Sequence, residues 1–467
     1  MSKVVIVGGG ITGLSAAYYL QKEVRERALP VEIVLLEAAD RLGGKIETVK
    51  RDGYIIERGP DSFLARKPEM IELAEEVGMA DKLVANATGS AYIYANGALH
   101  PIPVGSIMGI PTNEESFAAT NLVSEAGKAR AREDLRLPKS PPGQDQSLGA
   151  FFRYRLGDEV LENLIEPLLS GVYGGDLDEM SLLSTYPQFY EVEQKYGNLI
   201  DGMRQQAAEN AKNTPYQGGK QGMFRNFSTG LYSLVEAVEA RLTDVTVLKN
   251  SAVDELMADG GRYRLMMTDG SVIDEVDSVI ITTPHQFMQQ ILRDYDFMAP
   301  FKEVPSTSVV TISMAFPAEA IKQDLDGTGF LVSRNSDFHI TACTWITKKW
   351  AHSTPAGKVV LRCFLGKPGD EGYSSLSDEE LVATALDDLR QVMEIEGQPE
   401  FAEISRLDDA MSQYTVGHKA RLERAREQLD AKLPGVFIAG MSYGGIGLPD
   451  CVRQGREAAI AALEQLF

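Results

Sequence analysis

Three glycines near the N-terminus constrain the fold of this chain more than any other feature. Residues 8–13 read Gly-Gly-Gly-Ile-Thr-Gly, between a short apolar run and an apolar stretch with helical spacing. In such a turn Gly8 permits a tight reversal, Gly10 lets the backbone approach a pyrophosphate, and Gly13 lets helix and strand pack closely. The N-terminus of the helix offers free N–H groups to phosphate oxygens. The pattern predicts a strand, turn and helix that bind a dinucleotide.

The next apolar run completes this unit. Residues 31–36 form a second strand-like run that ends at Glu37, 24 residues beyond Gly13. An acidic residue near this spacing accepts hydrogen bonds from a nucleotide ribose. A secretory signal is the alternative, because residues 4–20 carry no charge and follow Lys3. The glycines that interrupt this run and the lack of a small-residue cleavage site favour the nucleotide-binding unit.

Length and composition bound the fold class. A chain of 467 residues is too long for one compact core, which predicts about two or three domains. Apolar residues make up 44% and charged residues 24%, as in ordinary globular proteins. No later uncharged stretch approaches the roughly eighteen apolar residues of a membrane span, so a spanning protein is not expected.

The net charge, the cysteines and the histidines argue against a nucleic-acid-binding protein, a disulfide-linked protein and a metalloprotein. The net charge is −21 and no Lys/Arg-rich block is present, which argues against nucleic-acid binding because phosphate would be repelled. Cys343, Cys363 and Cys451 form neither a metal pattern nor a disulfide framework, which indicates reduced thiols in the cytoplasm. The five histidines lack metal-binding spacings, so no metal site is predicted.

Residues 38–48 follow the dinucleotide-binding unit and indicate which dinucleotide cofactor it binds. They resemble the R-x-G-G-R-x-x-T segment of the amine-oxidase-like flavoproteins, with Arg41, Gly43 and Gly44 in the matching places. In that family the segment brings backbone amides and a basic side chain to the FAD phosphates. Lys45 stands where arginine is commoner, so it keeps the positive charge and loses the bidentate guanidinium fork. The resemblance implies FAD as the cofactor.

Four further motifs resemble a narrower family, the porphyrinogen oxidases of haem biosynthesis. They lie at residues 57–63, 167–176, 414–418 and 447–451, and the resemblance covers essentially the whole chain. It is strongest to the soluble type of Gram-positive bacteria, which oxidises coproporphyrinogen III to coproporphyrin III. The resemblance implies successive hydride transfers to FAD, reoxidation by O₂ with release of H₂O₂, and transient contact with ferrochelatase. It leaves the oligomeric state open.

The fold class implied is α/β, with a Rossmann-type FAD-binding domain, a sheet-plus-helix substrate domain and a helical insertion, an amine-oxidase-like architecture. Strands are predicted at 245–248, 262–267, 276–282, 309–314 and 358–364, and a charged helix at 377–396. The predicted division has three FAD-binding segments at 1–75, 215–300 and 416–467, two substrate-domain segments at 76–105 and 301–415, and the helical insertion at 106–214.

The resemblance, carried over residue by residue, implies one FAD site built from both ends of the chain. The predicted cofactor-binding residues are Gly8, Gly9, Gly10, Ile11, Thr12, Gly13, Glu37, Ala38, Lys45, Gly59, Pro60, Asp61, Ser62, Val253, Ile446, Gly447 and Leu448. Glycines at 444–447 would let backbone amides reach the flavin. The reaction needs no Ser-His-Asp set, carboxylate pair or Cys-His arrangement, and none is evident. No catalytic residue is therefore assigned.

Four residues are candidates for the substrate pocket. Gly174 and Gly175 would let the backbone approach a flat macrocycle, although a plain turn explains them equally well. Arg66 and Lys67 lie shortly after the first porphyrinogen-oxidase motif and are candidates to bind a propionate. The start of an exposed helix is the alternative explanation for this basic pair.

Three further features stay open. His418 is a candidate proton acceptor, with a structural hydrogen-bonding role as the alternative. Leu407 occupies a place near the flavin where the family often has tryptophan, which puts a stacking contribution in doubt. Residues 205–225 carry three basic residues among turn-forming residues and form either a mobile lid or a solvated loop.

The predicted substrate is coproporphyrinogen III, with protoporphyrinogen IX as the alternative. Charged residues occur throughout 124–158, without the apolar, basic-faced helix expected of a membrane-bound enzyme, and this favours the more water-soluble tetracarboxylate. An FAD amine oxidase is the rival enzyme, which Tyr443 in the C-terminal flavin segment keeps open. The non-enzyme alternative is a flavin-binding regulatory partner that has lost turnover, and nothing in the sequence indicates such a loss.

Overall fold

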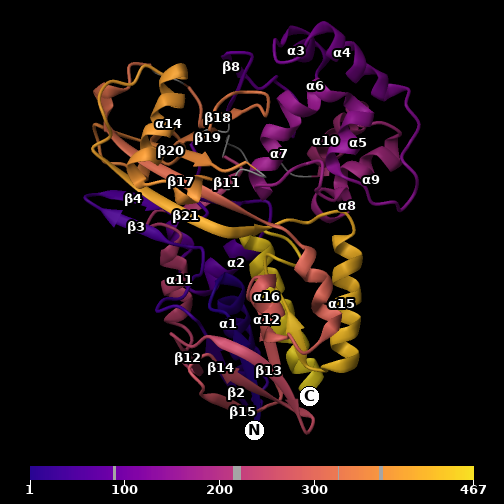
Figure 1. The fold of residues 1–467 in the computed structure, drawn as a ribbon, viewed down its shortest axis with the longest axis vertical. Coiled ribbons are helices and arrows are strands. Elements are labelled where there is room, and N and C mark those ends of the chain that lie inside the picture. Colours follow the sequence, from indigo (N-terminus) through magenta and orange to yellow (C-terminus); the bar gives the residue numbers. More distant parts are fainter. Residues whose placement is uncertain (88–90, 214–221, 324–325, 368–371) are drawn as a thin grey trace. The chain divides into compact units, whose positions relative to one another are not determined.

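The chain divides into two compact units. The computed structural model describes residues 1–87, 91–213, 222–323, 326–367 and 372–467 (Figure 1). Unit 1 comprises Met1–Ala85, Met223–Pro305 and Ala420–Phe467, and unit 2 comprises Asn86–Gly222 and Ser306–Lys419. Each unit is thus assembled from segments far apart in the sequence. The finer division into six segments stays a prediction.

A parallel sheet forms the centre of unit 1. Its strand order is β12-β2-β1-β16-β22, and neighbouring strands all run parallel. The strands are β1 (Ser2–Val7), β2 (Val31–Leu36), β12 (Val245–Leu248), β16 (Ser278–Ile281) and β22 (Val436–Ile438). Most of these strands are continuous apolar runs, because parallel sheets are covered on both faces.

The two faces of this sheet contribute to different cores. Val4 and Ile6 pack with helices α1 and α16, whereas Val5 and Val7 pack with strands β13–β15 and helix α12. This alternation follows from the two-residue period of a strand. The first face is covered by helices α1 (Ile11–Glu26), α2 (Glu69–Glu76), α11 (Tyr232–Glu239) and α16 (Leu448–Leu466). The second face is covered by strands β13 (Val253–Asp259), β14 (Arg262–Met267) and β15 (Val272–Val276), by helix α12 (His285–Ile291) and by the part of helix α15 (His418–Lys432) that belongs to unit 1.

Two small sheets in unit 1 hold the segment that follows the dinucleotide-binding unit. Strands β3 and β4 form an antiparallel hairpin, and β5, β11 and β6 form a three-stranded sheet. The strands are β3 (Thr48–Arg51), β4 (Tyr54–Glu57), β5 (Phe63–Leu64), β6 (Leu83–Ala85) and β11 (Phe224–Phe227). Residues 58–62 connect β4 to β5, so strand pairing fixes both ends of this connection.

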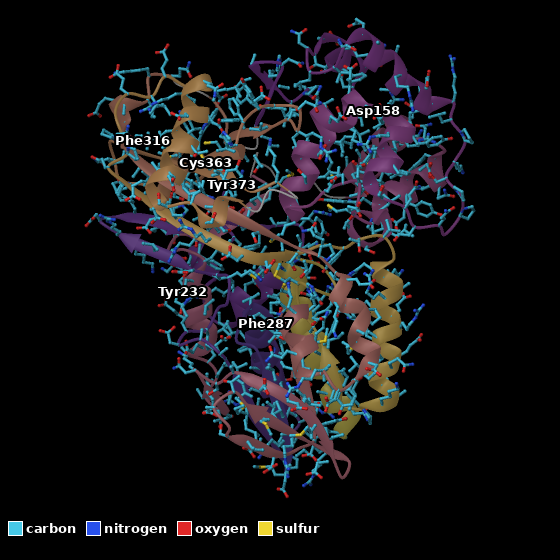
Figure 2. All side chains as sticks on the ribbon, viewed as in Figure 1. Asp158, Tyr232, Phe287, Phe316, Cys363 and Tyr373 are labelled. Carbon is cyan, nitrogen blue, oxygen red and sulfur yellow. The ribbon has the colours of Figure 1, made fainter. Side chains whose placement is uncertain are left out.

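A seven-stranded sheet organises unit 2. Its order is β21-β17-β20-β19-β18-β7-β8, and the pair β18–β7 runs parallel. The strands are β7 (Tyr92–Ala95), β8 (Ala98–Pro101), β17 (Ser306–Pro317), β18 (Gly329–Val332), β19 (Ile340–Trp345), β20 (Lys358–Leu365) and β21 (Phe401–Ser412). Helix α14 (Asp378–Val392) shares a core with Phe316 and Cys363 of this sheet (Figure 2). Cys343 lies opposite Cys363 on β19, and both are free thiols.

Helices make up most of residues 114–213 in the first segment of unit 2, and the helical insertion domain at 106–214 stays a prediction. The helices are α3 (Glu114–Ala119), α4 (Glu125–Arg132), α5 (Leu148–Leu156), α6 (Asp158–Val160), α7 (Glu166–Tyr173), α8 (Leu182–Thr185), α9 (Pro187–Tyr196) and α10 (Ile200–Asn213), after the short pair β9 (Ser106–Ile107) and β10 (Ile110–Pro111). Among the described residues, no helix is both long and apolar enough to pass through a membrane.

Three boundaries differ from the sequence-based expectations. Residues 205–213 continue α10 instead of forming a loop, because their glutamines and alanines are good helix formers; residues 214–221 lie outside the described residues. The helix predicted at 377–396 ends at Val392, because Met393 adopts an extended backbone and packs into the core. The strand predicted at 276–282 is split at Asp277, whose carboxylate accepts the Lys3 backbone N–H at 2.8 Å.

Candidate cofactor site

The turn between β1 and α1 needs glycine at two places for different reasons. Gly8 adopts φ +106°, a backbone conformation that residues with side chains rarely adopt. A Cβ atom at Gly13 would lie 1.8 Å from the Gly8 carbonyl oxygen, so only glycine lets α1 pack against the turn. The Thr282 hydroxyl, at the end of β16, donates to the same oxygen at 2.9 Å. The protein itself therefore fixes the tight geometry of the turn.

Gly10 differs from these two glycines because neither its backbone angles nor the space around a Cβ atom requires glycine. It is the N-cap of α1, and its angles of φ −67° and ψ 177° are accessible to any residue. A Cβ atom there would meet no described atom within 4 Å. Close approach of a pyrophosphate explains a glycine here, and the first turn of α1 supplies free N–H donors. The residues present therefore fit the phosphates of a dinucleotide.

Glu37 lies at the end of β2, beside the glycine turn. Its Oε2 accepts the Gly9 N–H at 2.7 Å, and its Oε1 accepts the Ala39 N–H at 2.8 Å. These bonds hold the carboxylate at the carboxyl end of the sheet, where nucleotides bind in open parallel sheets. The predicted contact with a ribose stays a prediction.

The glycine-rich loop at 41–45 packs on the same turn. Gly43 donates its N–H to the Gly9 carbonyl at 2.8 Å, and a Cβ atom at Gly44 would lie 3.2 Å from Gly10 Cα. Arg41 stabilises the loop from within, because its guanidinium donates to the carbonyl of Gly44 at 3.0 Å. The loop thus lies against the backbone that is predicted to approach the phosphates.

Lys45 ends this loop with a largely buried amine. Its Nζ lies 3.2 Å from the Met441 sulfur, in the segment that follows β22. Burial lowers the pKa of the Lys45 ammonium group. A Cβ atom at Gly59 would lie 1.8 Å from the Lys45 carbonyl oxygen. Residues 45, 59 and 441 therefore come together in unit 1.

Two residues that sequence reasoning missed position the C-terminal segment. Gln454 is buried, and its Oε1 accepts the N–H groups of Gly440 and Gly444, each at 3.1 Å. A Cβ atom at Gly455 would lie 2.3 Å from the Thr12 carbonyl oxygen, so this glycine lets α16 pack against the first turn of α1. A glycine within an otherwise regular helix is the signal that indicates such close packing.

Glu57 is the first residue of the motif at 57–63, and its hydrogen bonds organise the connection at residues 58–62. Its carboxylate accepts the Thr48 hydroxyl at 2.6 Å and the Leu231 N–H at 2.8 Å. Asn226 lies beside it and donates to the Asp61 carbonyl at 2.9 Å. Burial raises the pKa of Glu57, and these hydrogen bonds oppose that shift. Nothing local in the sequence indicates partners so far away in the chain.

All predicted FAD-binding residues lie in unit 1. Apart from those described above, Ile11 and Thr12 begin α1, Ala38 is exposed after β2, Pro60, Asp61 and Ser62 lie between β4 and β5, Val253 begins β13, and Ile446, Gly447 and Leu448 lead into α16. The Ser251 N–H, just before β13, donates to the Glu37 carbonyl at 2.8 Å. This bond places the start of β13 beside the nucleotide-binding end of β2.

The two basic residues predicted to bind a propionate, Arg66 and Lys67, have different surroundings in the structure. Lys67 Nζ contacts both carboxylate oxygens of Asp450 in α16, at 2.7 and 2.5 Å. Its charge is therefore paired within the protein. Arg66 is exposed and precedes α2, which begins at Glu69. Arg66 is thus the member of the pair that remains a candidate for an anionic substrate.

The predicted glycine pair of unit 2 ends α7. Gly174 caps the helix with φ +59°. A Cβ atom at Gly175 would lie 2.0 Å from Oε1 of Gln413, whose Nε2 donates to the Tyr173 carbonyl at 2.8 Å. The close approach at Gly175 is therefore made by Gln413, which supports the turn explanation. Approach of a macrocycle stays a prediction.

The remaining sequence candidates also lie in unit 2. His418 is buried and stacks on Tyr414, with ring centroids 4.0 Å apart and 9° between the ring planes. This packing favours a structural role over proton transfer. Leu407 lies on β21 opposite Val309 of β17. Among the described residues, no group of three or more His, Cys, Asp or Glu side chains is arranged to hold a metal ion.

Comparison with known proteins places this geometry in a family. Residues 11–463 match the family described as flavin containing amine oxidoreductase. The chain is 49% identical to the coproporphyrinogen III oxidase of Bacillus subtilis (strain 168), covering 99% of this chain and 98% of that protein. It is 43% identical to the protein of the same name from Staphylococcus aureus, covering 99% of each.

A solved structure agrees over the full length. It is a protein of Exiguobacterium sp. 255-15, provisionally named protoporphyrinogen oxidase, which is 42% identical and has a TM-score of 0.87. The match covers 100% of this chain and 99% of that chain. The predicted fold class, family and FAD dependence are confirmed. The chain belongs to the flavin-containing amine oxidoreductases, in their porphyrinogen-oxidase branch, and is an FAD-dependent oxidoreductase.

Proposed function

We propose that the chain oxidises coproporphyrinogen III to coproporphyrin III. The observation that carries this proposal is the 49% identity, over 464 residues, to a coproporphyrinogen III oxidase. The cofactor site supports it, because the glycine turn, Glu37 and the loop at 41–45 form a dinucleotide cradle.

FAD supplies the redox chemistry when bound, accepting two electrons and a proton as hydride in each step and returning the electrons to O₂ as H₂O₂. The protein's own residues would bind the cofactor and orient it. Gly10 and the first turn of α1 would hold the pyrophosphate and Glu37 would hold the ribose, while Gln454 fixes the backbone that precedes α16. No side chain needs to act as a nucleophile, because the flavin would accept the hydride.

Protoporphyrinogen IX is the alternative substrate, as the name given to the Exiguobacterium protein suggests. Coproporphyrinogen III carries four propionates, and protoporphyrinogen IX carries two. Each additional carboxylate requires a local cation in a protein of net charge −21. The exposed Arg66 offers one, and we therefore favour the tetracarboxylate.

An amine oxidase is the weaker candidate, although the same family includes such enzymes. Tyr443 kept this possibility open, but its ring is buried in a core of unit 1 beside Phe301, with centroids 6.0 Å apart. Its hydroxyl donates to the Thr283 carbonyl at 3.3 Å. A side chain held in this way does not line an amine channel. A regulatory role without turnover has no supporting observation.

We further propose that the enzyme acts in the cytoplasm and passes coproporphyrin III to ferrochelatase through a transient contact. The three free cysteines suit a reducing compartment, and a planar, poorly soluble product favours direct transfer to the next enzyme. Crosslinking of the two purified proteins tests the contact. Failure to crosslink, together with a product-transfer rate that falls when a protein that traps free porphyrin is added, would count against it.

The substrate assignment is tested by steady-state kinetics without detergent. FAD-loaded protein is given coproporphyrinogen III or protoporphyrinogen IX, and porphyrin fluorescence and H₂O₂ are measured together. We expect a higher kcat/KM for coproporphyrinogen III and three H₂O₂ per porphyrin, since six electrons are removed in total. A clear preference for protoporphyrinogen IX would reverse the assignment.

A further inference from the structure

Two of the three cysteines of this chain lie opposite each other in unit 2. Cys343 of β19 is the register partner of Cys363 of β20, and both thiols are free and buried (Figure 1). Cys451 lies in α16 of unit 1 and is also free and buried, so it offers an internal comparison. Strand pairing therefore brings together two thiols whose positions in the sequence show no disulfide pattern.

The strand register suits a bond between the two side chains. The Trp345 N–H donates to the Thr328 carbonyl at 2.8 Å, on the side of β18. Backbone groups alternate in direction along a strand, so those of Cys343 also face β18, and its pair with Cys363 is of the kind without mutual backbone hydrogen bonds. In such pairs the side chains lie closer and the Cα atoms are about 4.5 Å apart. Disulfides usually join Cα atoms about 4.4–6.8 Å apart, so a bond here requires little backbone movement.

The two thiols already contact each other. A hydrogen bond with Cys343 raises the pKa of the Cys363 thiol, and burial and the nearby Asp388 carboxylate act in the same direction. A thiol that is held in its neutral form reacts slowly with oxidants, because the thiolate is the nucleophile. The contact thus favours a disulfide, whereas the burial limits the rate at which it forms.

Neighbouring elements fix the positions of both cysteines. Asp388 of α14 accepts the backbone N–H groups of His339 and Ile340, at 2.7 and 2.8 Å, where β19 begins. On the other side of the pair, Cys363 is the register partner of Ile312 in β17. Both cysteines belong to the core that α14 shares with the sheet. The contact between the thiols is therefore a property of the sheet and not of a mobile loop.

We propose that Cys343 and Cys363 form a modification site, a dithiol that hydrogen peroxide converts into a disulfide. One thiolate attacks an oxygen of H₂O₂, which breaks the O–O bond, forms a sulfenic acid and releases hydroxide that is protonated to water. The second thiol then attacks this sulfur, which forms the S–S bond and releases a second water. The two thiols lose two electrons and two protons, and one peroxide is reduced to two molecules of water.

The proposed function supplies the oxidant, because reoxidation of the flavin by O₂ yields H₂O₂. The disulfide closes residues 343–363 into a loop and joins β19 to β20, so it stabilises unit 2 by restricting the unfolded chain. Slow reaction of buried thiols makes the bond a response to peroxide that persists over many turnovers, and not a step of the catalytic cycle. The source of peroxide rests on the proposed function, whereas the dithiol itself does not.

Added peroxide tests the dithiol without any porphyrinogen. FAD-loaded protein is incubated with H₂O₂ and denatured, and its free thiols and mass are followed with time. We expect the thiol count to fall from three to one, the mass to fall by two hydrogens, and dithiothreitol to reverse both changes. Peptide mapping should join Cys343 to Cys363 and leave Cys451 free. Unchanged thiols, addition of oxygen without a disulfide, or loss of Cys451 as fast as the pair would overturn the proposal.

Three variants separate the pair from cysteine oxidation in general. Cys451→Ala should lose two thiols at the wild-type rate, whereas Cys343→Ala and Cys363→Ala should form no internal disulfide. Peroxide should raise the unfolding temperature of the wild type and of Cys451→Ala only. The rate should rise with pH by up to about tenfold per unit, and a rate independent of pH would contradict attack by a thiolate. The thiol count and the peptide map of the wild type decide the proposal even if a variant of the pair folds poorly.

Turnover tests the source of the peroxide. With coproporphyrinogen III in air, we expect the same disulfide to accumulate as porphyrin forms, and catalase to prevent it. If added H₂O₂ forms the bond but turnover does not, or if catalase has no effect, the link to the enzyme's own product is overturned and the dithiol stands. Absence of porphyrin would show that the proposed function fails, and the result with added peroxide would still decide the dithiol.

Discussion

Two glycine-containing turns illustrate how the same residue serves different ends in this protein. The turn at 8–13 begins α1 in unit 1, and the turn at 173–175 ends α7 in unit 2. A side chain at Gly175 would collide with Gln413, whereas a side chain at Gly10 would meet no described atom. Both glycines were predicted to let a ligand approach the backbone closely. In the structure the Gln413 side chain fills the space beside Gly175, and no described side chain fills the space beside Gly10. The open space beside Gly10 leaves room for a ligand.

The largest effect is expected within the first turn, at Gly13. Gly13→Val should destabilise the apo-protein by about 3 kcal/mol or more, because its Cβ would lie 1.8 Å from a backbone oxygen that cannot move alone. Urea unfolding of the apo-protein measures this change. A variant as stable as the wild type would mean that α1 does not pack on the turn as described.

Gly10→Val should show the opposite pattern, only three residues away. The backbone angles of Gly10 suit any residue and a Cβ atom there would meet no described atom within 4 Å, so apo-protein stability should stay within about 0.5 kcal/mol of the wild type. FAD affinity should fall at least a hundredfold, because the new side chain occupies the phosphate approach. Equal FAD content in purified wild-type and variant protein would contradict the site.

Gly175→Ala should have a moderate effect that depends on Gln413. The clash at 2.0 Å involves the end of a flexible side chain, so the cost should be about 1–2 kcal/mol. In the double variant with Gln413→Ala, the additional cost of Gly175→Ala should largely disappear. Thermal unfolding of the four proteins gives this coupling. Costs that simply add would show that Gln413 is not the reason for the glycine.

The smallest effect is expected at the basic pair of unit 1. Arg66→Ala should raise KM for coproporphyrinogen III a few-fold, and more than for protoporphyrinogen IX, since an exposed contact to one propionate contributes up to about 1 kcal/mol. Lys67→Ala should act instead on FAD retention, because Lys67 pairs with Asp450 of α16. Equal KM changes in both variants would indicate that the pair acts together on substrate.

The sequence predicted those features whose cause is local. The glycine turn at 8–13 and the strand that ends at Glu37 follow from spacing over fewer than about thirty residues. The sequence did not predict that helix α10 extends to residue 213. Residues 205–225 contain many polar and turn-forming residues, although residues 205–213 by themselves favour a helix.

What could not be predicted depends on partners distant in the chain. Glu57 bonds to Leu231, Lys67 to Asp450, and Gln454 reaches back to Gly440. The same carboxylates and amides would be ordinary surface groups without these contacts. Gly175 was ambiguous for a related reason, because its partner Gln413 lies more than two hundred residues away. A single sequence gives no information about such pairs.

The central claim is that FAD bound in unit 1 takes hydride from coproporphyrinogen III. Anaerobic stopped-flow mixing of FAD-loaded protein with coproporphyrinogen III tests it most directly, with benzylamine and putrescine as comparison substrates. The account predicts that coproporphyrinogen III bleaches the flavin absorbance within the time of one turnover, while both amines leave it oxidised. Flavin reduction by an amine, together with no reduction by coproporphyrinogen III, would contradict it.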